Sequence, residues 1–203
     1  MTETSKWTVE AVTAQDLPSL GTINERAFHP NGEWHRKLFP SSATPWWKEK
    51  FALDLNDPTY RILKVSSPEF PGKVGGIICL RKYEAGERGA GRWTTYPGPP
   101  EGDAESYKAV IQSMIVYRER FMLEQTHMTV DFFGVDAEHQ GSGLGSKLLT
   151  KACQIADEEK LDMFVQANQY AYKFYQRFGF KAQGEEEMPG GLVEYFLIRR
   201  FNA

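Results

Sequence analysis

The chain has little cysteine and no strong excess of charge of either sign. Only Cys79 and Cys153 occur among 203 residues, which excludes a framework of several disulfides. With 24 Lys and Arg against 27 Asp and Glu, the net charge of -3 gives no basic footprint for nucleic acid. The four histidines show no metal-ligand spacing, so we predict no metal. The remaining expectation is a globular domain that is stabilised by its own apolar core.

Long apolar runs are missing as well. No stretch approaches the roughly 20 apolar residues that a membrane-spanning helix needs. The polar residues 1–6 are not typical of a secretory signal. We therefore expect a cytoplasmic protein with no membrane or nucleic-acid partner, folded as a single domain over residues 1–203. The sequence predicts no particular oligomeric state.

The most informative stretch is the glycine-rich run at 136–145, which reads Asp-Ala-Glu-His-Gln-Gly-Ser-Gly-Leu-Gly and precedes an amphipathic helical pattern. The first N–H groups of a helix lack intrahelical partners and carry partial positive charge, so they can bind phosphate. A dinucleotide fingerprint or a P-loop that starts at Gly141 would need glycine at position 146, where Ser146 stands. The run therefore predicts a phosphate-binding loop of another kind.

Two motifs resemble one enzyme family. Gln140, Gly143 and Gly145 match the Q/R-x-x-G-x-G/A coenzyme A loop of the GCN5-related N-acetyltransferase (GNAT) family. Residues 168–180 resemble that family's N-x-x-A-x-x-F-Y-x-x-x-G-F segment, matched at Asn168, Ala171, Phe174, Tyr175, Gly179 and Phe180. Within the family, the stretch from about 131 to 200 is most similar to the puromycin N-acetyltransferase branch, whereas roughly the first 120 residues match only loosely.

The hydrophobic pattern is that of one mixed α/β unit. It predicts strands at 7–12, 60–65, 74–80, 128–135, 161–167, 180–186 and 193–201, and helices at 14–28, 46–54, 106–124, 143–158 and 170–178. The resemblance implies a GNAT-type acyl-CoA N-acyltransferase fold, with a mostly antiparallel central sheet, one splayed parallel strand pair and flanking helices. Residues 1–125 would then form the acceptor side and residues 126–203 the acetyl-CoA-binding core.

The resemblance also implies an activity and the residues that carry it. The expected enzyme moves an acetyl group from acetyl-CoA to a primary amine of a small molecule, by direct attack in a ternary complex. The backbone of Phe133, Gly134 and Val135 would bind the pantetheine arm and the thioester carbonyl. The pyrophosphate would lie on the main chain of Gln140, Gly141, Ser142, Gly143, Leu144, Gly145 and Ser146.

Two further side chains acquire roles from the same resemblance. Asn168 would bond the pantetheine arm, although a helix N-cap is the alternative for this residue. Tyr175 would act as the general acid that protonates the departing thiolate, whereas by spacing alone it is a core aromatic.

Asp131 is the candidate general base or anchor of the substrate amine, because it is the one carboxylate inside the predicted strand at 128–135. Strict alternation would place Asp131, Phe133 and Val135 on one face of that strand. Burial would raise the pKa of Asp131 towards a useful value. The alternative is a structural carboxylate in an ion pair.

The acceptor side is less sharply defined. Residues 83–105 are rich in Gly and Pro, so we expect a mobile loop whose Trp93 and Tyr96 form a substrate lid. Glu185, Glu186 and Glu187 would be solvated unless one of them lines the acceptor cleft. Two other functions stay open, namely a protein or peptide N-acetyltransferase of the same fold and a non-catalytic coenzyme A-binding regulatory module.

Overall fold

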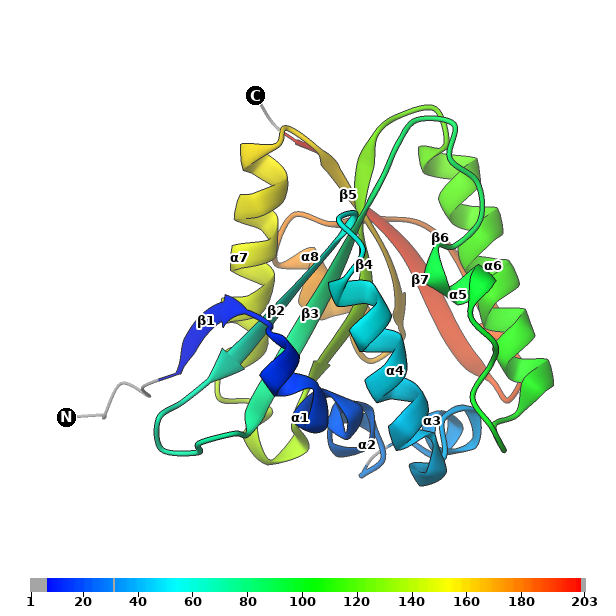
Figure 1. Cartoon of the computed structure of the whole chain (residues 1–203). Helices are drawn as coiled ribbons and strands as arrows, with labels where there is room; N and C mark the ends of the chain where they lie inside the picture. The colour runs from blue at the N-terminus through cyan, green and yellow to red at the C-terminus, as the bar shows by residue number, and fades with distance from the viewer. Residues whose placement is uncertain (1–6, 31, 202–203) are drawn as a thin grey trace.

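The computed structural model describes residues 7–30 and 32–201 and consists of one sheet with helices on both faces (Figure 1). The sheet has seven strands in these residues, in the order β1-β2-β3-β4-β5-β7-β6. The strands are β1 (Thr8–Ala11), β2 (Tyr60–Ser66), β3 (Val74–Tyr83), β4 (His127–Val135), β5 (Asp162–Asn168), β6 (Lys181–Met188) and β7 (Leu192–Arg199). All neighbours pair antiparallel except β4 and β5, which are parallel. The mixed α/β fold expected from the sequence is confirmed.

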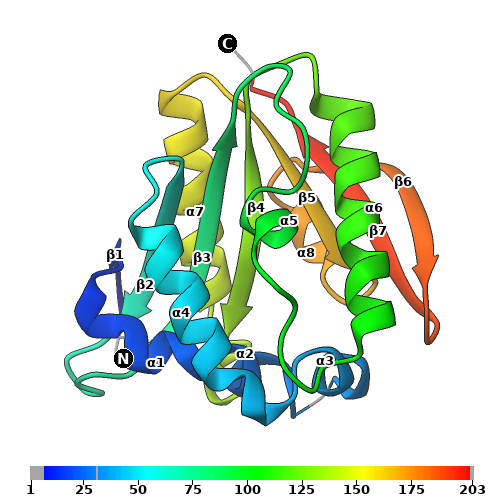
Figure 2. The same cartoon turned by 45° about the vertical axis from the view of Figure 1, so that its right-hand side comes forward.

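The helices divide between the two faces of the sheet. Figure 2 shows α7 (Leu144–Glu158) and α8 (Tyr172–Gln176) behind the sheet, and α4 (Thr44–Leu55) and α6 (Ala104–Met122) in front of it. The remaining helices are short: α1 (Leu17–Gly21), α2 (Ile23–Phe28), α3 (Glu33–Leu38) and α5 (Arg92–Thr95). In the described part of the chain no helix is long and apolar enough to cross a membrane.

Each face of the sheet has its own apolar core. The α7 side is built from one stripe of that helix, including Leu148, Leu149 and Ala152, all fully buried against β3, β4 and β5. The α4 side is dominated by aromatic residues, among them Trp47 and Phe51. We call these the coenzyme face and the acceptor face, after the roles that the resemblance implies for residues 126–203 and 1–125.

Two predicted helices differ from the structure. The helix expected at 14–28 is divided into the 3-10 turn Ala14–Asp16, α1 and α2. The break follows Gly21, where α1 packs so closely on α4 that an added Cβ would lie 3.2 Å from the Thr44 carbonyl oxygen. The helix expected at 170–178 is present only as the shorter α8. The sequence did not predict α3 or α5. Such short helices depend on tertiary contacts rather than on periodicity.

Candidate active site

The carboxyl halves of β4 and β5 separate from one another. The parallel register joins only three residue pairs, from His127 with Asp162 to Thr129 with Phe164. Beyond Thr129, β4 continues alongside β3, and β5 continues alongside β7. In the described residues the edge of β4 at Phe133–Val135 that faces β5 therefore has no strand partner. The splayed parallel pair expected from the sequence is confirmed.

The glycine loop lies at the end of β4 and is exposed. Gly141 has φ of 77° and Gly143 of 88°, and an added Cβ at either position would meet no atom within 4 Å. The side-chain amide of Gln140 donates to the carbonyl oxygens of Val135 at 2.9 Å and of Ala27 at 3.0 Å, which fixes the start of the loop. The open space over both glycines fits a bulky anion such as a pyrophosphate.

The loop ends at the first turn of α7. Gly143 is the N-cap in the left-handed conformation, and no side chain caps the helix. The N–H groups of Leu144, Gly145 and Ser146 belong to the turn that has no intrahelical acceptors, whereas the N–H of Lys147 already donates to Gly143. Three amides at a 15-residue helix terminus thus remain for a ligand.

Asn168 and Tyr175 lie across the splay from this loop. The Asn168 carboxamide oxygen accepts from the backbone N–H of Tyr170 and of Ala171, each at 3.1 Å, so it caps the turn before α8. Tyr175 is 4% exposed, and its ring packs edge-on against Phe180 with centroids 5.4 Å apart. Burial, reinforced by the nearby carboxylate of Glu194, raises the pKa of Tyr175, so its hydroxyl stays protonated at working pH.

Asp131 does not share a face with Phe133 and Val135, so the strict alternation expected for β4 is wrong. The register of β4 against β3 shifts between Phe132 and Val130, where a β-bulge inserts Asp131 as an extra residue. Phe133 and Val135 pack in the core of the coenzyme face, whereas Phe132 packs in that of the acceptor face. The bulge turns Asp131 to the acceptor face as well, towards α4.

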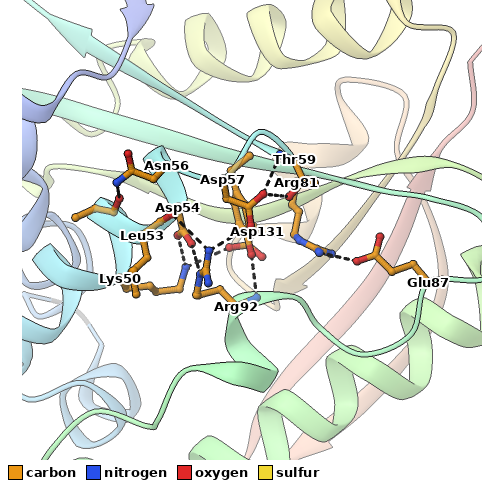
Figure 3. A network of polar contacts seen from close by, with 12 residues as sticks. Lys50, Leu53, Asp54, Asn56, Asp57, Thr59, Arg81, Glu87, Arg92 and Asp131 are labelled. Carbon is orange, nitrogen blue, oxygen red and sulfur yellow. Dashed lines mark hydrogen bonds and ion pairs between the residues drawn. The ribbon is translucent and has the colours of Figure 1, made fainter.

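There Asp131 takes part in a buried charge network (Figure 3). The Lys50 ammonium, which is fully buried, lies 2.8 Å from Asp54 Oδ2 and 3.4 Å from Asp131 Oδ2. Arg92 Nε lies 3.2 Å from Asp54 Oδ1. Burial works against the charge on Lys50, but Asp131 and Asp54 outweigh it and raise the pKa of Lys50. Burial also raises the pKa of Asp131, as expected, and Lys50 partly offsets this.

The same network contains the one cluster of potential metal ligands that the described residues provide. Ligand atoms of Asp54, Cys79 and Asp131 lie within 4.8 Å of one another. The Lys50 ammonium already lies between both carboxylates of this cluster, and Arg92 also pairs with Asp54. A metal ion would have to displace a buried ammonium there, so the donor set fits Lys50 rather than a metal.

A cavity of about 200 Å³ opens at the splay, between the acceptor face and Tyr175. Aromatic rings form much of its wall, notably those of Phe28, Trp34, Phe39, Trp47, Trp93 and Tyr107. Several buried polar atoms of its lining have no hydrogen-bond partner, namely Asn24 Nδ2, Trp47 Nε1, Tyr107 Oη, Thr129 Oγ1, Asp131 Oδ1 and both amide atoms of Gln166. Because buried polar groups are almost always paired, such a concentration indicates a site for a small molecule.

A wider cavity of about 980 Å³ adjoins this one, since Phe28, Trp34, His35, Asn168 and Ala171 line both. It also reaches Gln140 at the glycine loop and the turn at Pro189–Gly191. A continuous route therefore connects the loop, through the splay, to the aromatic cavity. Phosphate binding at one end and a small apolar group at the other fit this arrangement.

The segment 83–105 forms part of the cavity wall. Trp93, in α5, is 7% exposed and lines the cavity, whereas Tyr96 packs outside it against Trp46. Arg118 of α6 donates to the carbonyl oxygens of Gly89 and Glu87, at 2.8 and 2.7 Å from Nη2. The segment is thus bonded to the body of the protein, and its opening as a lid stays a prediction.

Glu194 was missed by the sequence reasoning. It lies on β7, is 8% exposed and lines the aromatic cavity. Of the acidic run that we singled out instead, Glu185 and Glu187 are exposed, and Glu186 accepts a hydrogen bond from Ser113 at 2.6 Å. The available signal was a lone carboxylate inside the apolar run Leu-Val-Glu-Tyr-Phe-Leu-Ile at 192–198.

Known proteins share both the sequence pattern and the architecture. The profile of the acetyltransferase (GNAT) family matches residues 32–180. The chain belongs to this family. An uncharacterised N-acetyltransferase of Schizosaccharomyces pombe is 38% identical to this family member over 52 residues, which are 26% of the chain and only 22% of the yeast protein. Resemblance to the puromycin branch stays a prediction.

Solved structures of family members extend the fold comparison to nearly the whole chain. Arylalkylamine N-acetyltransferase 2 of Aedes aegypti superposes with a TM-score of 0.71 at 13% identity, covering 98% of this chain and 100% of that one. A polyamine N-acetyltransferase of Drosophila melanogaster gives 0.67 at 14% identity, covering 96% and 99%. At these identities the comparison shows the shared GNAT fold.

Proposed function

We propose that this GNAT protein transfers an acetyl group from acetyl-CoA to the primary amine of a small aromatic molecule. The observation that carries the proposal is the position of the aromatic cavity, which opens at the splay between β4 and β5 and continues to the glycine loop. A thioester that enters along the coenzyme face and an amine held on the acceptor face would meet there.

Backbone groups without hydrogen-bond partners would bind the coenzyme. The main chain of residues 140–146 would hold the pyrophosphate, and the unpartnered edge at Phe133–Val135 would bond the pantetheine amides and polarise the thioester carbonyl. Asn168 lines both cavities and would position the pantetheine arm beside its capping role. The residue ranges 1–125 and 126–203 would then divide into acceptor and coenzyme halves.

Tyr175 would protonate the thiolate that leaves. Tyr175 lines the cavity, and its hydroxyl remains protonated because burial raises its pKa. Asp131 would anchor the acceptor through Oδ1, while Oδ2 stays with Lys50. The Trp93 indole approaches Asp131 and favours its ionised form, but neither Trp93 Nε1 nor Asp131 Oδ1 completes a hydrogen bond of standard geometry. Both atoms are therefore available to a polar substituent.

Size and charge of the cavity favour an arylalkylamine over a polyamine. An engineered cavity of roughly 150 Å³ binds benzene, so a cavity of about 200 Å³ suits one ring with a short chain. The far wall carries Asp131, but Lys50 neutralises it, and the Lys50 ammonium lies 4.2 Å from the centre of the Trp93 ring. At that wall a second cationic group would be repelled by Lys50 and would lose its hydration, because Asp131 is already paired with Lys50.

The first test is the binding of acetyl-CoA. At a hundred times its dissociation constant, acetyl-CoA should stabilise the protein by about 2.7 kcal/mol and raise Tm by roughly 5–10 °C. Gly143→Glu should abolish the shift, because a carboxylate would stand in the open space over the loop. Gly86→Glu is the matched control, since Gly86 also has positive φ (80°) and open space but lies in the segment after β3 and not in the loop that begins α7. An unchanged shift in Gly143→Glu would contradict the assigned phosphate loop.

The second test is a panel of amines, scored by thiol release from acetyl-CoA. We expect kcat/KM for 2-phenylethylamine and tyramine to exceed that for agmatine and spermidine by at least about tenfold, because Lys50 opposes a second charge. Preference for the polyamines would contradict the aromatic acceptor. Turnover of peptide N-termini alone would favour a protein acetyltransferase, and release from no amine would favour a regulatory coenzyme A module.

A further inference from the structure

Glu194 occupies a distinctive place in the sheet. It stands on β7 directly opposite Asn168 of β5, so both side chains project from the same face. Its neighbours two and four residues on, Phe196 and Ile198, pack under α6 on the acceptor face. The carboxylate therefore lies on the side from which the amine would approach, next to the strand that splays from β4.

No hydrogen bond or ion pair holds this carboxylate in the described residues, although Glu194 is only 8% exposed. The other buried or half-buried acids nearby are engaged: Asp131 with Lys50, and Glu186 with Ser113. Burying an unpaired ionisable group destabilises a fold, and such groups cluster at sites where a ligand or a reaction uses them. Glu194 and Tyr175 line the same cavity, so two groups able to exchange protons face one space.

We infer that Glu194 is the general base that accepts the proton of the acceptor ammonium. This role rests on the proposed acetyl transfer and replaces the one considered for Asp131. Glu194 takes one proton from the ammonium and passes it to solvent, and the freed lone pair forms the C–N bond with the thioester carbon. As the C–S bond breaks, its electron pair leaves with sulfur, sulfur takes the Tyr175 proton, and the second amine proton returns to Tyr175.

The other titratable groups of the cavity are poorer bases. Apart from Glu194, the titratable residues that line the cavity are His35, Tyr83, Tyr107, Arg118, Asp131 and Tyr175. Burial lowers the pKa of His35 to about 4, too low to deprotonate an ammonium efficiently, whereas burial raises that of Glu194 to about 8. Glu186, directly across on β6, adds a carboxylate on the same face but outside the cavity. Asp131 is bound to Lys50, and Arg118 donates to backbone carbonyls.

The experiment compares pH profiles of kcat/KM for 2-phenylethylamine. In the natural protein the value should rise with pH up to about 8 and then level off, as the Glu194 carboxyl ionises. Glu194→Gln should lower kcat/KM by about 100-fold or more at pH 8 and remove this limb, and Glu194→Asp should restore part of the rate. The ionisation of the amine itself contributes equally to every profile.

Glu186→Gln is the matched control, because it removes a carboxylate from the same face one strand away. This variant should keep both the kcat/KM of the natural protein and its rise with pH. If kcat/KM still rises with pH in Glu194→Gln but no longer does so in Asp131→Asn, the role of Glu194 is wrong while acetyl transfer still holds. No thiol release by the natural protein, despite a thermal shift with acetyl-CoA, would instead overturn the proposed function. Those two failures are therefore distinguishable.

Discussion

Replacement of Lys50 by methionine should lower the free energy of unfolding by about 3–5 kcal/mol, because it leaves two buried carboxylates without their shared counter-ion. Lys50 has no exposed side-chain surface, and neither has Asp54 or Asp131. Arg92 still neutralises Asp54, so the uncompensated charge falls mainly on Asp131. Urea unfolding at pH 7 measures the change.

The matched control is Lys37→Met. Lys37 also forms an i,i+4 ion pair, with Glu33 at 3.0 Å, but both side chains are about two-thirds exposed or more, at 66% and 73%. Its loss should leave the free energy of unfolding nearly unchanged, because exposed ion pairs contribute little. The loss of stability in Lys50→Met should become smaller as pH falls. Without Lys50, the pKa of Asp131 is higher in the folded state than in the unfolded state, so protonation favours the folded state. Equal costs for the two variants would contradict the buried network.

Tyr175→Phe should reduce kcat by about 10²–10⁴-fold while leaving the affinity for acetyl-CoA nearly unchanged. The substitution keeps the ring that packs against Phe180 and removes only the hydroxyl of this cavity-lining residue. Without this proton donor, the coenzyme would leave as an unprotonated thiolate. Steady-state thiol release and the acetyl-CoA thermal shift, measured on the same preparation, separate the two effects.

Tyr172→Phe provides the control on the same helix. The Tyr172 ring stacks on Tyr195 with centroids 4.2 Å apart, and it lines neither cavity. This change should leave kcat within about twofold, since it touches no reacting atom. If both variants lose activity equally, or if Tyr175→Phe abolishes the thermal shift, Tyr175 is structural rather than catalytic.

Much of the coenzyme side could be predicted from sequence, because its determinants are local. Glycine permits positive φ, and Gly141 and Gly143 both have it. The apolar stripe of α7 and the β-branched, aromatic run of β4 predicted both elements to within a residue or two. A helix N-terminus needs no distant partner to bind phosphate, so a short motif is enough to predict such a site, and phosphate binding there stays a prediction.

The acceptor side could not be predicted in the same way, because each decisive feature joins distant segments. The bulge that turns Asp131 arises from the pairing of β4 with β3 and leaves no mark on the alternation of β4 itself. Lys50 lies 81 residues from Asp131 in the chain, and nothing in the helical pattern of α4 indicates that its ammonium is buried.

The sequence by itself determined the glycine loop and the strands and helices that flank it, since glycine conformation and hydrophobic periodicity act over a few residues. The tertiary structure alone decided which carboxylate is held by a cation and which is left free. Desolvation and ion pairing depend on what surrounds a side chain in space, and strand pairing brings Glu194 beside Asn168 whereas helix packing brings Lys50 to Asp131.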